Sequence, residues 1–214
     1  MATRGEVLGR LLAGRVVAVI RMKDADRLAS VAAALGRGGV RAVEVTMTVP
    51  GAVGIIRELG RTKGAGALVG AGTVLDAATA AAVIEAGADF VVSPVFDRDT
   101  VAACREAGVV VAPGAFTPTE IVAAWRAGAD LVKVFPATSL GPQFVRDVRG
   151  PLPEVRLMPT GGVTVENARD FLAAGAACVG LGTALVDAKD VEAGDWAAIE
   201  AKARRLVGSL GGLS

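Results

Sequence analysis

Two charged residues, Glu44 and Lys133, lie inside apolar runs of the sequence and are the first candidates for chemistry. Lys133 has apolar neighbours on both sides in Leu131-Val132-Lys133-Val134-Phe135, a run that is typical of a strand covered on both faces. Burial disfavours a charged ammonium and favours the free amine, which attacks a carbonyl carbon to form a Schiff base. We therefore expect Lys133 to act as a nucleophile. The alternative is that Lys133 and Glu44 form a structural ion pair.

Glu44 lies in a second apolar strand, between Val43 and Val45. Alternation places Glu44 on one face with Ala42 and Thr46, and the two valines on the other face. The larger apolar set should face covering helices, so the Glu44 side chain should point into the interior of the sheet structure. A carboxylate in that position is a candidate general acid and base. The alternative is a carboxylate that balances a buried Arg or Lys.

A recurring pattern in the chain indicates the elements that position these two residues. In each copy, a helix-like stretch ends at a glycine and an apolar run follows at once. A glycine in the left-handed conformation ends a helix, and the apolar run is typical of a buried parallel strand. The copies contain Gly38-Gly39-Val40, Ala86-Gly87-Ala88, Ala107-Gly108-Val109, Ala127-Gly128-Ala129 and Ala174-Gly175-Ala176.

Counting the apolar runs predicts about eight strands, and eight parallel strands suggest a closed (β/α)8 TIM barrel in a single domain, residues 1–214, with a short N-terminal helix. A helix start is indicated at Thr117-Pro118-Thr119-Glu120, which can form a capping box. The alternative is an open, doubly wound sheet, but the first strand lacks the glycine-rich phosphate turn of that fold. The expected strands are Arg15–Arg21, Val40–Met47, Ala67–Thr73, Phe90–Pro94, Val109–Pro113, Leu131–Phe135, Val155–Thr160 and Cys178–Gly182.

Composition excludes several function classes. Among 214 residues, 23 are Lys or Arg and 22 are Asp or Glu, so no net field attracts nucleic acid or an anionic membrane. The chain has no His, which removes the commonest metal ligand and general base, and we expect no metal site. No apolar stretch is long enough to span a membrane, and the N-terminus does not resemble a signal peptide. We interpret Cys104 and Cys178 as reduced packing residues of a cytoplasmic protein.

Small residues end the other strands, as in Gly70-Ala71-Gly72-Thr73, Ser93-Pro94 and Pro113-Gly114. The last two strands end in Pro159-Thr160-Gly161-Gly162 and Gly180-Leu181-Gly182-Thr183. In barrels, backbone N–H groups at these two positions commonly bind phosphate. A phosphate or carboxylate group on the substrate is therefore expected.

Together these segments resemble the motifs of a known enzyme family. Glu44-Val45-Thr46, Gly70-Ala71-Gly72-Thr73-Val74, Ser93-Pro94, Pro113-Gly114, Lys133-Val134-Phe135-Pro136-Ala137 and Pro159-Thr160-Gly161-Gly162 are similar, in order, to those of the 2-keto-3-deoxy-6-phosphogluconate (KDPG) and 4-hydroxy-2-oxoglutarate aldolases. The resemblance covers nearly the whole chain. It implies a homotrimeric barrel, with no cofactor and no metal, that cleaves a 2-keto-4-hydroxy acid to pyruvate and an aldehyde through a Schiff base.

The resemblance also implies roles for individual residues. Lys133 would form the imine and Glu44 would transfer protons in each step. The residues implied to line the pyruvate pocket are Thr73, Pro94 and Phe135. The resemblance implies that Thr160 contacts the substrate. It implies that a distal phosphate is held by Gly161, Gly162, Gly182 and Thr183.

One position departs from the family pattern. The KDPG aldolases carry an Arg four residues after the Glu, where it binds the substrate carboxylate, and this chain has Thr48 there. Arg21 ends the first strand, and the phosphogalactonate relatives are similar to this chain in having Arg there. Arg21 is therefore a candidate for the missing guanidinium; the alternative is a solvated charge at the end of a strand.

Two other functions remain open on the sequence. The first is a phosphate-binding barrel isomerase or epimerase in which Glu44 and Lys133 exchange protons without a covalent intermediate. The second is a catalytically silent oligomeric scaffold, since the chain is unusually apolar, with a mean hydropathy of +0.51.

Overall fold

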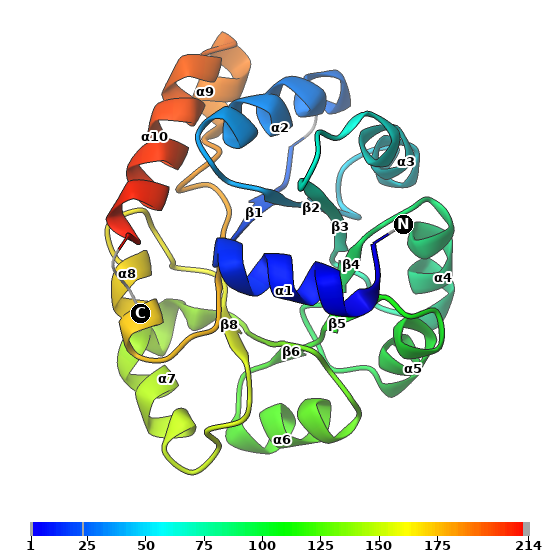
Figure 1. Ribbon diagram of the computed structural model, residues 1–214, viewed down its shortest axis with the longest axis vertical. Helices are drawn as coiled ribbons and strands as arrows, with labels where there is room; N and C mark the ends of the chain where they lie inside the picture. The colour runs from blue at the N-terminus through cyan, green and yellow to red at the C-terminus, as the bar shows by residue number, and fades with distance from the viewer. Residues whose placement is uncertain (1, 23, 212–214) are drawn as a thin grey trace.

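A computed structural model describes residues 2–22 and 24–211, and it shows short parallel strands in a ring surrounded by helices (Figure 1). The strands are β1 (Val16–Ile20), β2 (Ala42–Thr46), β3 (Leu68–Gly72), β4 (Phe90–Val92), β5 (Val110–Ala112), β6 (Gly114–Ala115), β7 (Val132–Val134), β8 (Leu157–Pro159) and β9 (Val179–Leu181). The helices are α1 (Arg4–Gly14), α2 (Leu28–Arg37), α3 (Ala52–Thr62), α4 (Ala77–Glu85), α5 (Arg98–Glu106), α6 (Pro118–Arg126), α7 (Gly141–Arg149), α8 (Ala168–Ala173), α9 (Ala188–Ala193) and α10 (Trp196–Ser209).

Strand pairing follows the order of the chain around the ring. One sheet has the order β5-β4-β3-β2-β1-β9, and the other has the order β6-β7-β8. A parallel bridge between Thr160 and Gly180 joins β8 to β9, and β5 and β6 are two parts of one strand. The predicted (β/α)8 barrel with its N-terminal helix is confirmed, and the alternative of an open, doubly wound sheet is wrong because consecutive strands are neighbours throughout.

The expected fifth strand, Val109–Pro113, differs from the structure because it is divided. Proline has no N–H to donate, so the ladder is interrupted at Pro113. The Pro113 carbonyl oxygen still accepts a hydrogen bond from the N–H of Lys133 at 2.8 Å, and β6 then continues beside β7. The division therefore lies directly opposite the lysine.

The glycine pattern works as the sequence indicates. The glycine in each of the five copies has a positive φ, and the values are 96° at Gly39, 92° at Gly87, 69° at Gly108, 98° at Gly128 and 102° at Gly175. An L-residue with a side chain rarely adopts this conformation, whereas glycine adopts it readily. The predicted capping box at the start of α6 is also present.

Apolar side chains form two separate cores. One lies between the strands and the outer helices and includes Val43 and Val45. The other fills the interior of the ring, where inward-facing residues such as Leu68 and Phe90 pack against Val7 and Leu11 of α1. Helix α1 crosses one end of the ring (Figure 1), and Arg4 fixes it there through a 2.7 Å ion pair with Asp130 at the start of β7. The end of the barrel where the strands begin is therefore closed.

In the described part of the chain, no helix is long and apolar enough to cross a membrane. Cys104 and Cys178 are both free and buried, and burial raises the pKa of each thiol to about 12. Neither sulfur is placed to react in the folded protein.

Candidate active site

Glu44 and Lys133 both point into the ring, from strands on opposite sides of it. Glu44 is in register with Val19 of β1 and Gly70 of β3. Lys133 is in register with Gly114 and Met158. The Lys133 Nζ atom lies 3.9 Å from Glu44 Oε1, and the two residues are 4% and 1% exposed. The expectation that both are buried is confirmed, and the structure brings them together.

Three glycines inside the strands make room for the side chains of Glu44, Thr160 and Phe90. A methyl group at Gly72 would overlap the Glu44 carboxylate, and one at Gly180 would overlap the Thr160 hydroxyl. A methyl group at Gly70, which is in register with Glu44, would overlap the ring of Phe90. Sequence reasoning did not find these roles. The sequence did contain one indication, which is that these glycines occur within expected strands. Glycine lowers the stability of a strand, so its presence there indicates that another group needs the space.

The Glu44 carboxylate is the only side chain in the described residues with buried oxygen atoms that lack a hydrogen bond, and both of its oxygens do. Desolvation raises the pKa of Glu44, while the nearby charges of Lys133 and Arg21 act in the opposite direction. A carboxyl group with a raised pKa and free oxygens is suited to accept and return a proton. The Lys133 Nζ atom also lies 5.0 Å from the centre of the Phe135 ring.

A cavity of about 280 Å³ opens at the end of the ring where the strands finish, opposite α1. Its lining brings together seven of the residues singled out in the sequence: Arg21, Phe135, Thr160, Gly161, Gly162, Gly182 and Thr183. Glu44 and Lys133 are outside this lining, as are Thr73 and Pro94, which follow the ends of β3 and β4. The backbone of Thr73 is in the left-handed region with φ 59°, an uncommon conformation for a residue with a side chain.

Sequence reasoning missed part of the lining, namely Val19, Val163, Thr164, Ala184 and Val186. Two loops contribute most of it, residues 160–164 after β8 and residues 182–186 after β9. In the first loop Gly161 and Gly162 have φ values of 83° and 75°. Among the hydrogen bonds of the described residues, none uses the N–H groups of Gly161 and Gly162 as donors. Such groups are suited to bind an anion.

Arg21 and Thr48 lie at the same rim. Arg21 is exposed and lines the cavity, and its charge acts on Glu44. The hydroxyl groups of Thr48 and Thr46 are 2.7 Å apart, and the Thr46 hydroxyl donates to the carbonyl oxygen of Ile20. Thr48 is thus connected, through the Thr46 hydroxyl, to the backbone next to Arg21. Within the described residues, no group of three or more His, Cys, Asp or Glu side chains could hold a metal ion.

Comparison with known proteins identifies the family. Residues 7–202 match the family model described as KDPG and KHG aldolase. The chain is 39% identical over 199 residues to the KHG/KDPG aldolase of Escherichia coli strain K12, covering 92% of each protein.

The fold is similar to those of solved members of this family, including two crystal structures. One is KDPG aldolase from Legionella pneumophila with pyruvate captured at low pH as a covalent carbinolamine intermediate, with a TM-score of 0.86, 29% identity, and 96% and 98% of the two chains covered. The other is the 2-keto-3-deoxy-6-phosphogluconate aldolase of Zymomonas mobilis ZM4 with 3-phosphoglycerate, with a TM-score of 0.84, 30% identity, and 96% of each chain covered. On this sequence match and this fold, the chain belongs to the KDPG and KHG aldolase family of carbon–carbon lyases.

Proposed function

We propose that the protein is a class I aldolase that reversibly cleaves KDPG, or a close 2-keto-4-hydroxy acid analogue, to pyruvate and an aldehyde. The observation that carries the proposal is the buried pair of Lys133 Nζ and Glu44 Oε1, 3.9 Å apart, in which both carboxylate oxygens lack a hydrogen bond. The pair offers a nucleophile and a proton carrier inside the ring, where Lys133 lies against Phe135 of the cavity lining. The Legionella relative, caught with pyruvate as a carbinolamine, supports the same chemistry here.

In the forward direction, the free amine of Lys133 attacks the keto carbon of the substrate. Glu44 transfers the protons that convert the carbinolamine to an imine, and water leaves. The Glu44 carboxylate then takes the proton of the C4 hydroxyl, the C3–C4 bond breaks, and its electron pair moves to the iminium nitrogen. The aldehyde leaves, Glu44 returns the proton to C3 of the enamine, and hydrolysis of the imine releases pyruvate and the free lysine.

The cavity supports the assignment of the two ends of the substrate. Arg21 binds the substrate carboxylate, because it lines the cavity close to Glu44 and no Arg follows Glu44 at Thr48. The phosphate binds to the backbone and hydroxyl groups of Gly161, Gly162, Gly182 and Thr183. The Zymomonas relative, solved with 3-phosphoglycerate, supports a phosphorylated substrate. Thr73, Pro94 and Phe135 complete the pyruvate pocket, and Thr160 contacts the substrate.

The same proposal covers the form in which the enzyme works. We infer one catalytic domain over residues 1–214, a homotrimer in the cytoplasm. The free, buried thiols of Cys104 and Cys178 are compatible with a reducing compartment.

The test is covalent trapping of pyruvate by borohydride, read by intact mass. Wild type should gain the mass of one reduced pyruvyl group, and Lys133→Ala should gain none. Lys189→Ala is the matched control, because Lys189 is exposed on α9 and its loss should leave the adduct unchanged. Glu44→Gln should form the adduct much more slowly.

Folded wild-type protein that gives no adduct would overturn the proposal. Turnover without an adduct would then indicate an isomerase or epimerase that uses the same two residues as acid and base. Assembly with no turnover would indicate a silent scaffold.

A further inference from the structure

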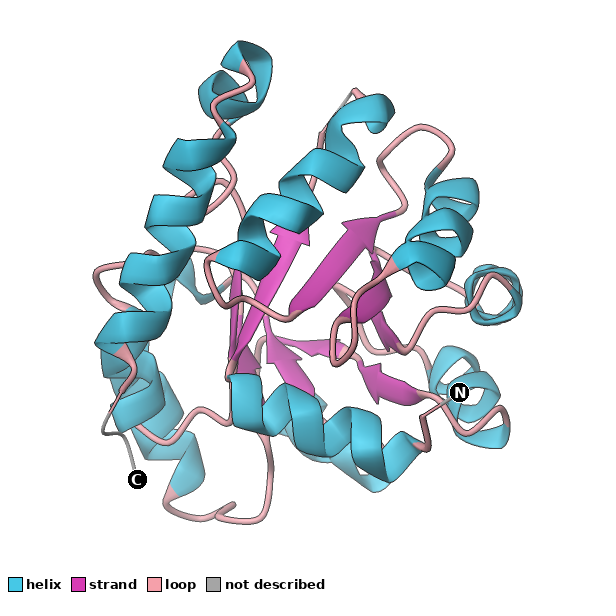
Figure 2. Cartoon of the chain, turned by 45° about the horizontal axis from the view of Figure 1, so that its top comes forward, coloured by secondary structure: helices cyan, strands magenta, loops and turns pink. Residues whose placement is uncertain are grey.

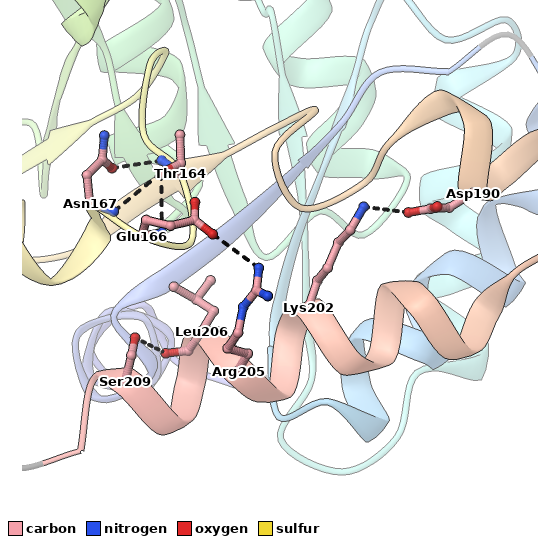
Figure 3. Close-up of polar contacts among 8 residues, drawn as sticks. All are labelled: Thr164, Glu166, Asn167, Asp190, Lys202, Arg205, Leu206 and Ser209. Atoms are coloured by element: carbon pink, nitrogen blue, oxygen red, sulfur yellow. Dashed lines mark hydrogen bonds and ion pairs between the residues drawn. The ribbon is translucent and has the colours of Figure 1, made fainter.

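The side chain of Asn167 joins two points of the loop that lines the cavity, although Asn167 itself is outside the lining. Its Oδ1 atom accepts a hydrogen bond from the N–H of Thr164 at 2.8 Å. Its Nδ2 atom donates to the carbonyl oxygen of Gly162 at 2.9 Å. Figure 3 shows the Asn167 side chain turned towards Thr164. One amide group therefore holds the backbone on both sides of Val163.

Thr164 strengthens this connection from the other direction. Its Oγ1 atom accepts hydrogen bonds from the N–H groups of Glu166 at 3.2 Å and Asn167 at 3.3 Å. The donors and acceptors of the two side chains are thus used reciprocally, as in a capping box. The segment from Gly162 to Asn167 is consequently a closed hydrogen-bonded unit.

The other side of the loop is held by packing. A methyl group at Gly162 would lie 2.6 Å from the Cα atom of Thr138, in the segment that follows β7. At Gly161 a methyl group would contact the ring of Phe135 at 3.4 Å. The loop is therefore fixed between the strand that carries Lys133 and the amide of Asn167.

Holding the Gly162 carbonyl also sets the direction of an N–H group. A peptide unit is planar, so the orientation of its carbonyl determines that of its N–H. The bond from Asn167 to Gly162 therefore orients the N–H of Val163, a residue of the cavity lining. N–H donors that are already oriented towards the site before an anion binds lose less conformational entropy on binding it.

We propose that Asn167 is a positioning residue for the distal phosphate of the substrate, and that it thereby sets the preference for phosphorylated over unphosphorylated keto acids. This inference rests on the proposed function. Asn167 contacts neither Lys133 nor Glu44, so imine formation does not depend on it. It acts only on the part of the substrate that reaches the loop.

The test compares Asn167→Ala with Glu166→Gln. Glu166 is the matched control because it is adjacent and exposed, its carboxylate pairs with Arg205 of α10 (Figure 3), and Gln retains the backbone N–H that bonds to Thr164. In Asn167→Ala the KM for KDPG should rise about tenfold, which corresponds to the loss of about one hydrogen bond. Its kcat should change little, and inorganic phosphate should inhibit more weakly by a similar factor. Glu166→Gln should match wild type in each assay.

Two readouts separate positioning from a general structural effect. The KM for 2-keto-3-deoxygluconate, which lacks the phosphate, should be the same in wild type and Asn167→Ala. The exchange of pyruvate methyl protons for deuterium, which requires the imine and enamine but no phosphate, should also be the same. Equal losses for both substrates, or no loss for either, would overturn the inference.

Asn167→Asp keeps the test usable if the alanine variant folds poorly. Its carboxylate can still accept from the Thr164 N–H but cannot donate to Gly162, so the KM for KDPG should again rise. An unchanged KM in this variant would overturn the inference. Failure of the proposed function looks different, because wild type itself would then show no deuterium exchange with pyruvate.

Discussion

Replacing Gly72 by alanine should inactivate the enzyme without unfolding it. Gly72 is the last residue of β3, and its φ is not positive, so alanine is tolerated by the backbone. The new Cβ would lie 2.6 Å from Cγ of Glu44, whereas carbon atoms normally approach to about 3.5–4.0 Å. The Glu44 side chain must therefore move by about 1 Å or more. A displacement of this size in a catalytic group can cost about 100-fold in rate.

The assay is KDPG cleavage followed through pyruvate release, with circular dichroism to confirm the fold. Gly72→Ala should lower kcat about 100-fold and change KM much less. Gly70→Ala is the matched control, because it lies on the same face of the same strand but its methyl group meets Phe90 instead of Glu44. It should lower the free energy of unfolding by about 1–3 kcal/mol and largely retain kcat. A folded Gly72→Ala variant with wild-type kcat would refute the reasoning.

Two further predictions concern stability. The pKa of Glu44 is raised in the folded protein above its ordinary value of 4.5, so its contribution to stability is present below about pH 4.5 and is lost as pH rises through the folded pKa. The Tm of Glu44→Gln relative to wild type should therefore increase with pH. Glu120→Gln is a control in which the pH dependence should be reversed. Hydrogen bonds from the backbone of Phe116 and Thr117 lower the pKa of Glu120, so the stability that Glu120 contributes is lost as pH falls. A Tm difference that is independent of pH for Glu44→Gln would contradict this. Leu11→Ala should lower the free energy of unfolding, measured in urea, by about 3 kcal/mol, because Leu11 is 2% exposed and packs against the interior of the ring. Leu75 is 53% exposed, so the control Leu75→Ala should lower the free energy of unfolding by less than about 1 kcal/mol. Equal effects of the two leucine variants would mean that α1 does not seal the barrel.

Most of the fold could be predicted because its signals are local. A glycine that ends a helix is followed at once by an apolar strand, and both features can be recognised within about ten residues. The division of the fifth strand at Pro113 could not be located, since it depends on which neighbouring strands offer acceptors on each side. The ring itself was predicted from the number of strands, whereas its closure depends on contacts such as the bridge between Thr160 and Gly180.

The candidate site was predicted less completely, for a physical reason. Glu44 and Lys133 could be recognised because a charge inside an apolar strand is anomalous in the sequence alone. The roles of Gly72 and Gly180 could not, because a glycine within a strand shows only that space is needed and not which side chain fills it. Asn167 was missed for a similar reason, since its contacts with Gly162 and Thr164 depend on the path of the loop.

The closure of one end of the barrel by α1 imposes an order on the catalytic cycle. Helix α1 lies across the end of the ring where the strands begin (Figure 2), and its Val7 and Leu11 pack into a filled apolar interior, so among the described residues the reaction chamber opens only at the other end. The keto acid, both products and the water that hydrolyses the imine must use the same opening. In the proposed cycle the aldehyde is formed next to that opening while pyruvate is still bonded to Lys133 behind it. Departure of the aldehyde therefore precedes hydrolysis, and the enzyme releases its two products in a fixed sequence.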